Sequence, residues 1–174
     1  AMTLPEVGGS WLESFSAELS TLIEHYDIPL VGGNLARGSL SLTMTVLGTL
    51  PVGGAATRVG ASTGDDIYAT GTLGDAAAGL DRVNSGDSTG YLACRYIRPA
   101  PRLVAGENLR DIVTSMIDIS DGLIAEIGHL TETDGLGAQV DCAALPLSEE
   151  LIAAVGRSGA QQRALFAGDD YELC

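Results

Sequence analysis

The sequence predicts an α/β or α+β protein. Hydrophobic patterns typical of strands and of helices alternate along the chain, which favours these two fold classes. Gly contributes 23 residues while aromatic residues make up only 5% of the chain, and small side chains suit tight turns and close helix–sheet packing. A length of 174 residues suits about one domain, or one domain with part of another, and is enough to bury a sizeable core.

Composition and charge exclude several classes of function. All nine basic residues are Arg, and 23 acidic residues give a formal net charge of −14. Without Lys the chain cannot contain a Walker A loop, a Schiff-base lysine or the strand lysine of protein kinases. The negative charge argues against a nucleic-acid partner, which would require a basic surface. Any phosphate must therefore be held by Arg, by backbone N–H groups or by metal ions on carboxylates.

The remaining composition predicts a cytoplasmic protein with no membrane partner. The chain has no visible signal peptide and no run of about 18 apolar residues that could span a membrane. Three Cys without C-x-x-C spacing and only two His argue against a zinc site and fit a reduced, cytosolic compartment. Both His25 and His129 fall in predicted helices and are interpreted as structural.

The first fifty residues predict a helix followed by short strands. Apolar residues recur at helical spacing over residues 10–26, where Ser10 and Glu13 form a predicted capping box. A short strand is expected at 30–31, ahead of a glycine turn. Residues 39–50 begin with strict alternation, which predicts a half-buried strand. Its other face carries small hydroxyls, and a partner subunit is one candidate to cover it.

After a Pro-Val-Gly-Gly boundary at 51–54, the pattern changes to strand, glycine turn and helix. The predicted strands lie at 66–71, 116–119 and 138–141, with another beginning at 171. The predicted helices lie at 74–85, 88–97, 101–115, 120–133, 148–155 and 162–166. Because a strand opens at the last residues of the sequence, we expect the chain to be a fragment of a longer protein.

The sharpest chemical feature is the Asp-Ile-Ser-Asp-Gly segment at 118–122, where a predicted strand ends and a helix begins. Asp118 and Asp121 could hold Mg²⁺, a hard cation that binds carboxylates together with phosphates. Ser120 is the expected N-cap, and free N–H groups at the start of the helix would attract phosphate. The alternative is an ordinary capping motif with a solvated Asp.

A glycine turn and an isolated arginine are weaker candidates. In the turn at 32–38, Gly33 lets a ligand approach the backbone, and the Asn34 side-chain oxygen is a candidate metal ligand. Arg58 could pair with phosphate in a fork geometry. The alternatives are a simple turn for the first segment and a surface ion pair for Arg58.

Two further segments combine glycine with carboxylates. At 71–75 a predicted strand leads into a helix, and this junction could bind phosphate or simply start the helix. At 168–172 three carboxylates occupy four consecutive positions, either around a cation or in a solvated loop.

Taken in order, these segments form a specific series. The series comprises Val31-Gly32-Gly33-Asn34, Gly60-Ala61-Ser62-Thr63-Gly64-Asp65, Gly71-Thr72-Leu73-Gly74-Asp75, Arg98-Pro99-Ala100-Pro101-Arg102, Ile117-Asp118-Ile119-Ser120-Asp121-Gly122, Leu145-Pro146-Leu147-Ser148 and Gly168-Asp169-Asp170-Tyr171-Glu172-Leu173. It closely resembles the thiamine-monophosphate kinase family of the AIR-synthase-related ATP-binding superfamily, at similar spacings throughout the chain. The resemblance implies an AIR-synthase-like α/β (α+β) fold. Residues 1–50 would be the remainder of an N-terminal mixed-sheet dimerisation domain, and residues 51–174 an incomplete C-terminal α/β sandwich domain.

The resemblance also implies an activity. Members of the family are dimers that transfer the γ-phosphoryl group of ATP to thiamine monophosphate, giving thiamine diphosphate and ADP. They use several Mg²⁺ ions and neither a P-loop nor a catalytic Lys, which agrees with the Lys-free composition.

The same resemblance assigns roles to individual positions. The positions that match nucleotide contacts are Gly33, Asn34, Arg58 and Ser120. The positions that match magnesium ligands are Asn34, Asp118 and Asp121, where Asn34 replaces an Asp common in the family. Asp169 matches an acidic substrate contact that is usually Glu.

Two other functions stay open on the sequence alone. One is another ATP-dependent reaction of the same superfamily, with a different acceptor. The other is a catalytically inactive dimer scaffold.

Overall fold

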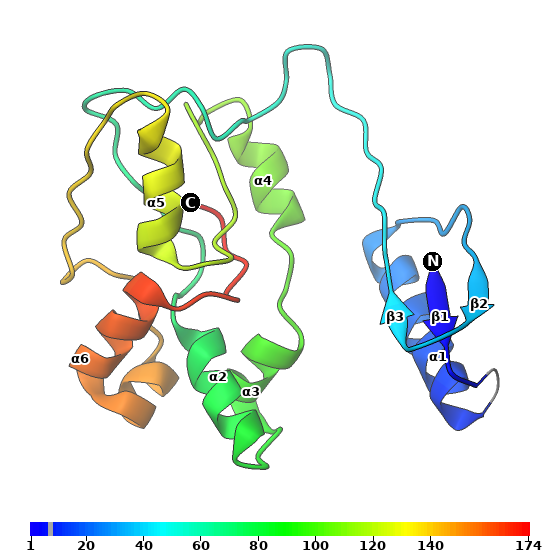
Figure 1. Ribbon diagram of the computed structural model, residues 1–174. Helices are drawn as coiled ribbons and strands as arrows, with labels where there is room; N and C mark the ends of the chain where they lie inside the picture. Colours follow the sequence, from blue (N-terminus) through cyan, green and yellow to red (C-terminus); the bar gives the residue numbers. More distant parts are fainter. Residues whose placement is uncertain (7–8) are drawn as a thin grey trace. The chain divides into compact units, whose positions relative to one another are not determined.

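The computed structural model describes residues 1–6 and 9–174. The chain divides into two compact units, Ala1–Thr49 and Leu50–Cys174, and each is described by itself. The structure contains both helices and strands, although the strands are few and short. The prediction of a mixed α/β chain is therefore confirmed. Figure 1 colours the first unit blue to cyan and the second cyan to red.

Unit 1 combines a three-stranded sheet with one helix. Strand β1 (Met2–Leu4) pairs in parallel with β2 (Leu35–Arg37) and antiparallel with β3 (Ser41–Leu42), giving the order β2-β1-β3. Helix α1 (Ser10–Tyr26) has the bounds that the apolar periodicity predicts. Figure 1 shows the three strands side by side, with β1 in the middle.

The predicted capping box at the start of α1 is wrong. Gly9 is the N-cap, with φ 101°, and no side chain makes a capping hydrogen bond. Ser10 is already the first residue of the helix, so its hydroxyl is not placed to cap the next turn. The last turn ends as a left-handed cap at Asp27, whose φ is 52°.

The strands predicted at 30–31 and 39–50 are also wrong. The first segment is irregular, and of the second only β3 is a strand. Thr43 still exchanges backbone hydrogen bonds with Ala1, at 2.8 and 2.7 Å, but among the described residues of unit 1 no strand continues beside the residues that follow. An alternating pattern forms a strand only where another strand offers its backbone groups. The apolar face is accordingly exposed, with Met44 66% and Val46 73% accessible.

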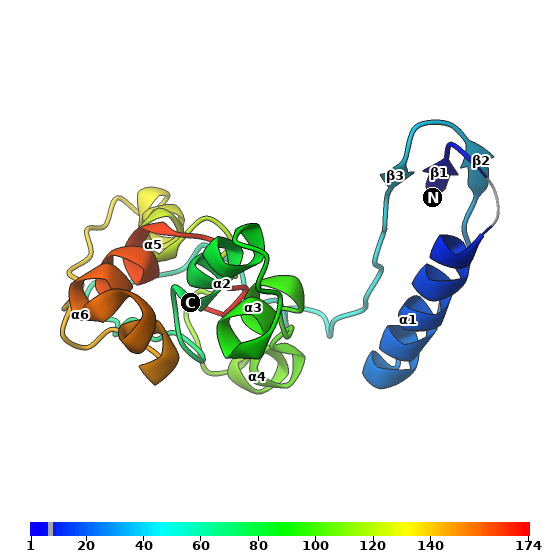
Figure 2. The ribbon, with the colours of Figure 1, turned by 90° about the horizontal axis from the view of Figure 1, so that it is seen from below.

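Unit 2 contains five helices within its described residues. They are α2 (Asp75–Asn84), α3 (Gly90–Ile97), α4 (Leu103–Leu109), α5 (Leu123–Glu132) and α6 (Glu149–Phe166). Helix α2 packs against α3 and α6, and α5 packs against α6. Figure 2 shows this grouping from a second side. Each predicted helix is confirmed in kind, although most begin later or end earlier than the sequence suggests.

Two of the predicted helices join into one element. The segments predicted at 148–155 and 162–166 lie in α6, which is kinked where Gly156 adopts φ 71° and ψ 162°. Such a left-handed conformation is accessible to Gly without a steric cost. Ser148 caps the helix, because its hydroxyl oxygen accepts a hydrogen bond from the N–H of Leu151 at 3.0 Å.

The strands predicted for unit 2 shrink to a single bridge. Residues 66–71 and 138–141 are irregular. Residues 116–119 and the segment after 171 do pair antiparallel: Ile117 and Cys174 exchange two backbone hydrogen bonds of 2.9 and 2.8 Å, around the bridge between Asp118 and Leu173.

Apolar side chains from distant parts of unit 2 form its core. One cluster joins the loop before α2, the segment before α5, α5 itself and α6; its buried members are Leu73, Ile119, Leu123, Ile127, Leu145 and Ala164. A second cluster joins α2, α3 and α6 through Ala78, Leu92, Leu151 and Ala160. Burial of this apolar area is the main force that holds the segments together. Among the described residues, no helix has the length and hydropathy needed to cross a membrane.

Candidate functional site

The Asp118–Asp121 segment runs along the C-terminal segment of the chain with its two carboxylates exposed. Ile119 between them is fully buried and donates its N–H to the carbonyl of Glu172 at 2.7 Å. Side chains alternate in direction along extended backbone, so burial of Ile119 turns its neighbours outward. The pairing thus fixes where Asp118 points.

The expectation that Ser120 caps helix α5 is wrong. The N-cap is Gly122, with φ 110°, and it makes no side-chain cap. A Cβ at Gly122 would lie 2.9 Å from the backbone of Phe166, so only Gly fits this turn. The Ser120 hydroxyl instead donates to Glu126 at 3.2 Å.

The N–H groups ahead of α5 are not free for phosphate. Glu126, in the first turns of α5, accepts hydrogen bonds from the backbone N–H of Ser120 at 3.3 Å and of Asp121 at 3.0 Å. The carboxylate of the protein itself therefore takes the place that the sequence assigns to a ligand. Glu126 is 2% exposed, and sequence reasoning missed it because the prediction looked for donors and not for their acceptor.

Asp169 comes to the same place as Asp118 and Asp121. Its N–H donates to the carbonyl of Ser120 at 2.9 Å. The pKa of Tyr171 is raised, first by the charge of Asp169, then by burial and the hydrogen bond with Asp169, and further by the charges of Asp118 and Asp121. Three of the predicted site residues, Asp118, Asp121 and Asp169, therefore act on one phenol.

The backbone at this point is strained. Asp169 has φ 68° and Tyr171 has φ 50°, a left-handed conformation that non-Gly residues rarely adopt. Strain of this kind costs on the order of 1–3 kcal/mol per residue and concentrates at functional sites.

Arg58 lies in unit 2, on a loop fixed by carboxylates. The carbonyl of its neighbour Thr57 accepts a hydrogen bond from Met116 N–H at 2.9 Å, which ties this loop to the start of the 116–119 segment. Asp65 accepts hydrogen bonds from Thr114 at 2.7 Å and from Ser62 N–H at 2.9 Å, and these bonds, Thr114 first, lower its pKa. Within the described residues of unit 2, the exposed Arg58 makes no ion pair, so unit 2 gives no support to the surface-pair alternative.

Gly33 and Asn34 lie in unit 1, immediately before β2, and both are exposed. The Asn34 carbonyl accepts a hydrogen bond from Met2 N–H at 2.8 Å, which continues the pairing of β1 and β2 by one residue. This bond accounts for the backbone of Asn34 and leaves its side chain at the surface of the unit.

The junction at 71–75 starts a helix and does not form a phosphate nest. Asp170, 1% exposed, accepts hydrogen bonds from the N–H groups of Gly74 and Ala76 at the start of α2. Burial raises the pKa of Asp170, and those two N–H groups oppose the shift. Of the two alternatives left open for 71–75, the helix start is therefore confirmed.

The carboxylates of the cluster at 168–172 are divided, since Asp169 is exposed while Asp170 and Glu172 are buried. Glu172 is fully buried and pairs with Arg95 at 2.8 Å and with Arg102, whose Nε–H donates at 2.6 Å. Thr70 donates a third hydrogen bond at 2.6 Å. Burial raises the pKa of Glu172. Hydrogen bonds from Arg102 and Thr70 and the charges of both arginines together lower it by more, so the net pKa shift is downward.

Another buried carboxylate, that of Asp75, accepts hydrogen bonds from three hydroxyls. Tyr91 donates at 3.0 Å, and Thr72 and Ser148 donate as well. Arg95 Nε lies 3.7 Å away, buried and without a hydrogen-bond partner. Sequence reasoning missed these groups because the partners are distant along the chain.

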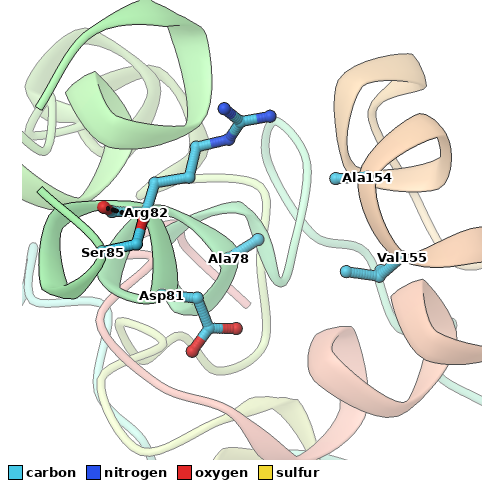
Figure 3. Close-up of a pocket in the computed structure, with 6 residues that line it drawn as sticks. All are labelled: Ala78, Asp81, Arg82, Ser85, Ala154 and Val155. Atoms are coloured by element: carbon cyan, nitrogen blue, oxygen red, sulfur yellow. Dashed lines mark hydrogen bonds between the residues drawn. The ribbon is translucent and has the colours of Figure 1, made fainter. Parts of the chain in front are cut away.

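Two hollows open on unit 2. The one beside the site has a volume of about 350 Å³ and is lined by Pro101, Arg102, Leu103, Gly106, Glu107, Asp118, Tyr171 and Leu173. The other, of about 270 Å³, lies between α2 and α6 and contains no predicted site residue (Figure 3). The charged groups of this second hollow are already paired, Asp81 with Arg163 at 2.8 Å and Arg82 with Asp87 at 3.0 Å.

The donors present suit a magnesium ion held jointly with phosphate. Among the described residues no three His, Cys, Asp or Glu side chains form a ready metal site. The exposed Asp118 and Asp121 supply two carboxylates on one loop. Mg²⁺ is commonly held by one or two carboxylates and completes its shell with water and substrate phosphates.

Comparisons with known proteins identify relatives along the whole chain. No family model matches it. The thiamine-monophosphate kinase of Escherichia coli is 47% identical over 180 residues, which take in 100% of this chain and 55% of the relative. That of Haemophilus influenzae is 40% identical over 179 residues, with 100% and 55% covered. The chain thus spans about half the length of the curated relatives it matches.

Solved structures give the same result. The crystal structure of thiamine-monophosphate kinase from Stenotrophomonas maltophilia is 40% identical and superposes with a TM-score of 0.92, over 99% of this chain and 58% of that one. AaThiL complexed with AMPPCP and TMP is 30% identical, with a TM-score of 0.81 over 99% and 58%. In sequence and in fold, this chain is therefore similar over its whole length to the thiamine-monophosphate kinases, as its series of motifs predicts.

Proposed function

We propose that the protein containing this chain is a Mg²⁺-dependent thiamine-monophosphate kinase that transfers the γ-phosphoryl group of ATP to thiamine monophosphate. The observation that carries the proposal is 47% identity to a thiamine-monophosphate kinase across every residue of the chain. It is supported by the charges of Asp118, Asp121 and Asp169, which all act on Tyr171, and by the hydrogen bond from Asp169 N–H to the Ser120 carbonyl. The products are thiamine diphosphate and ADP.

The roles proposed for the residues follow from their chemistry. Asp118 and Asp121 would hold Mg²⁺ together with phosphate oxygens. The neutral side-chain oxygen of Asn34 is likewise proposed as a magnesium ligand. The Arg58 guanidinium, exposed and unpaired within unit 2, would bind a phosphate of the nucleotide, with Gly33 and Ser120 as further nucleotide contacts. Asp169 would contact the thiamine moiety.

The mechanism proposed is direct in-line transfer. The acceptor is itself a phosphate, whose oxygen is already anionic near neutral pH, so the reaction needs little base catalysis. The main obstacle is repulsion between two polyanions. Bound magnesium ions supply positive charge that offsets this repulsion and the charge of the transition state. The work of this chain is to hold Asp118 and Asp121 in place for them and to add the charge of Arg58.

The assembly proposed is a cytoplasmic homodimer with more than one Mg²⁺ ion. Residues 1–50 would belong to the N-terminal dimerisation domain and residues 51–174 to the C-terminal α/β domain. The division of the chain between Thr49 and Leu50 supports this arrangement. So do the exposed apolar residues after β3, which would suit a dimer interface in the complete protein.

The decisive experiment uses the complete protein. It is incubated with ATP, thiamine monophosphate and Mg²⁺, and the products are separated by chromatography. Thiamine diphosphate formed in step with ADP is the expected result. ADP formed without thiamine diphosphate would point to another acceptor, and absence of both nucleotide binding and turnover would contradict the proposal.

A further inference from the structure

Glu126 is a buried carboxylate for which the proposed reaction has no direct use. It lies on α5, on the side of the helix that faces the core, and is 2% exposed. Burial of a charged group is costly unless hydrogen bonds compensate for lost hydration. Its hydrogen bonds should therefore reveal what it does.

One oxygen of Glu126 binds three donors of the site loop. Oε1 accepts from Asp121 N–H at 3.0 Å, from Ser120 N–H at 3.3 Å and from the Ser120 hydroxyl at 3.2 Å. No other side chain of the described residues binds these two backbone N–H groups. The loop is thus held from the helix side by a single atom.

The opposite side of the loop is held by backbone pairing. Ile119 N–H donates to the Glu172 carbonyl at 2.7 Å, and Asp169 N–H donates to the Ser120 carbonyl at 2.9 Å. Between these contacts and Glu126, the peptide groups from 119 to 121 are fixed on both sides. The exposed carboxylates of Asp118 and Asp121 take their separation from this frame.

We propose that Glu126 is a positioning residue that sets the geometry of Asp118 and Asp121 by accepting hydrogen bonds from the loop that carries them. The inference rests on the proposed function for its kinetic consequences. The structural part does not, since it concerns the loop alone. Groups that orient metal-binding residues from behind typically change metal affinity or activity by about 10–100-fold when removed.

Three substitutions separate hydrogen bonding from charge. Glu126→Gln keeps an acceptor oxygen at the same reach and removes the charge. Glu126→Ala removes both. Glu126→Asp keeps the charge but shortens the side chain by one methylene, and it also serves if the Ala variant does not fold. Glu132→Gln is the matched control, because Glu132 lies on the same helix and is exposed.

The first readout is amide hydrogen exchange in the complete protein without ligands. We expect the N–H groups of Ser120 and Asp121 to exchange at least about tenfold faster in the Ala and Asp variants, because their acceptor is lost. The Gln and control variants should exchange like the wild type. Unchanged protection in both the Ala and the Asp variants would overturn the inference.

The second readout is Mg²⁺ binding by calorimetry, followed by kinetics. Glu126→Ala should weaken Mg²⁺ binding and lower kcat by about 10–100-fold with little change in KM for thiamine monophosphate, and Glu126→Gln should restore both. A Gln variant as impaired as Ala would show that charge and not geometry is at work, against the inference. If the wild type makes no thiamine diphosphate, the proposed function fails, while hydrogen exchange and Mg²⁺ binding still decide the role of Glu126.

Discussion

The two faces of the segment at 168–174 carry carboxylates in opposite situations. On the outward face, Asp169 is exposed, as are Asp118 and Asp121, and the charges of all three raise the pKa of Tyr171. On the inward face, Asp170 and Glu172 are buried, and each is bound by donors from a different part of unit 2. The same residue type therefore serves two purposes, and the alternation of the backbone decides which.

The comparison teaches that the inward carboxylates hold the segment in place, and that this fixed backbone positions the outward carboxylates. Asp170 ties the segment to the start of α2, and Glu172 ties it to α3 and to the arginine before α4. Changes on the inward face should therefore affect stability, and changes on the outward face should affect ligand binding and turnover.

The largest effect is expected on the inward face. Glu172→Ala leaves Arg95 and Arg102 without their shared carboxylate, and removal of one partner from a buried ion pair costs about 3–5 kcal/mol. Urea unfolding of the complete protein would measure the loss. A variant within 1 kcal/mol of the wild type would break the comparison, because Glu172 would then not hold the segment in place.

On the outward face, Asp118→Asn should remove activity while leaving the fold intact. Loss of one preorganised electrostatic group typically lowers kcat by about 10²–10³, or roughly 3–4 kcal/mol. Initial rates at saturating substrate test the loss of activity, and the unfolding midpoint tests whether the fold is intact. If Asp121→Asn also lost activity and kept its stability, the distinction between the outward and the inward face would be sharper. Full turnover in both variants would remove these residues from the proposed site.

Acid should separate the two inward carboxylates. The pKa of Glu172 is lowered, so its stabilisation is complete above the ordinary Glu value of about 4.5 and is lost as pH falls through its lowered pKa. The pKa of Asp170 is raised, so the folded state takes up that proton first and the contribution of Asp170 grows as pH falls.

Unfolding free energies between pH 7 and pH 3 measure this difference. The Glu172→Gln variant should lose less stability than the wild type at the acid end of the range. Asp170→Asn should lose more, because it lacks the group whose protonation favours folding. Parallel curves for all three proteins would contradict the assignment of these two shifts.

The smallest effect is expected for Tyr171→Phe. The hydroxyl removed lies at the surface, 3.4 Å from Asp169, and exposed substitutions of this kind usually change stability by no more than about 0.5 kcal/mol. The raised pKa of Tyr171 should disappear from a spectrophotometric titration. A loss of several kcal/mol in the free energy of unfolding would show that Tyr171 stabilises the fold as the inward residues do, against the division between the two faces.

The helices of this chain could be predicted from its sequence and the strands could not. Helix α1 forms over the predicted residues because its hydrogen bonds are local. The strand predicted at 39–50 fails after Leu42 because a strand needs a partner, and periodicity does not say whether one is present. The start of α5 differs from the prediction because Glu126, a side chain within the helix, accepts from the backbone N–H groups ahead of it in place of a side-chain cap.

The candidate site was predictable in its exposed half. Asp121 and Asp169 stand out as carboxylates next to glycine and Asp118 as a carboxylate three residues before Asp121, and the charges of all three act on Tyr171. Arg95, Arg102 and Glu126 could not be found this way. Their partners are distant in sequence or are backbone groups, and a single sequence contains no record of either.

The contacts of Glu172 and Asp170 also bear on the order in which the protein folds. Thr70 and Glu172 are 102 residues apart, and Gly74 and Asp170 are 96 apart. Closing a loop of this length costs conformational entropy before the hydrogen bonds between its ends can form, so such contacts slow folding. We expect the helices to form early, and the pairing of 117–119 with 172–174 to come last. Ligand-binding competence would then appear in refolding experiments only after most of the helical signal has returned.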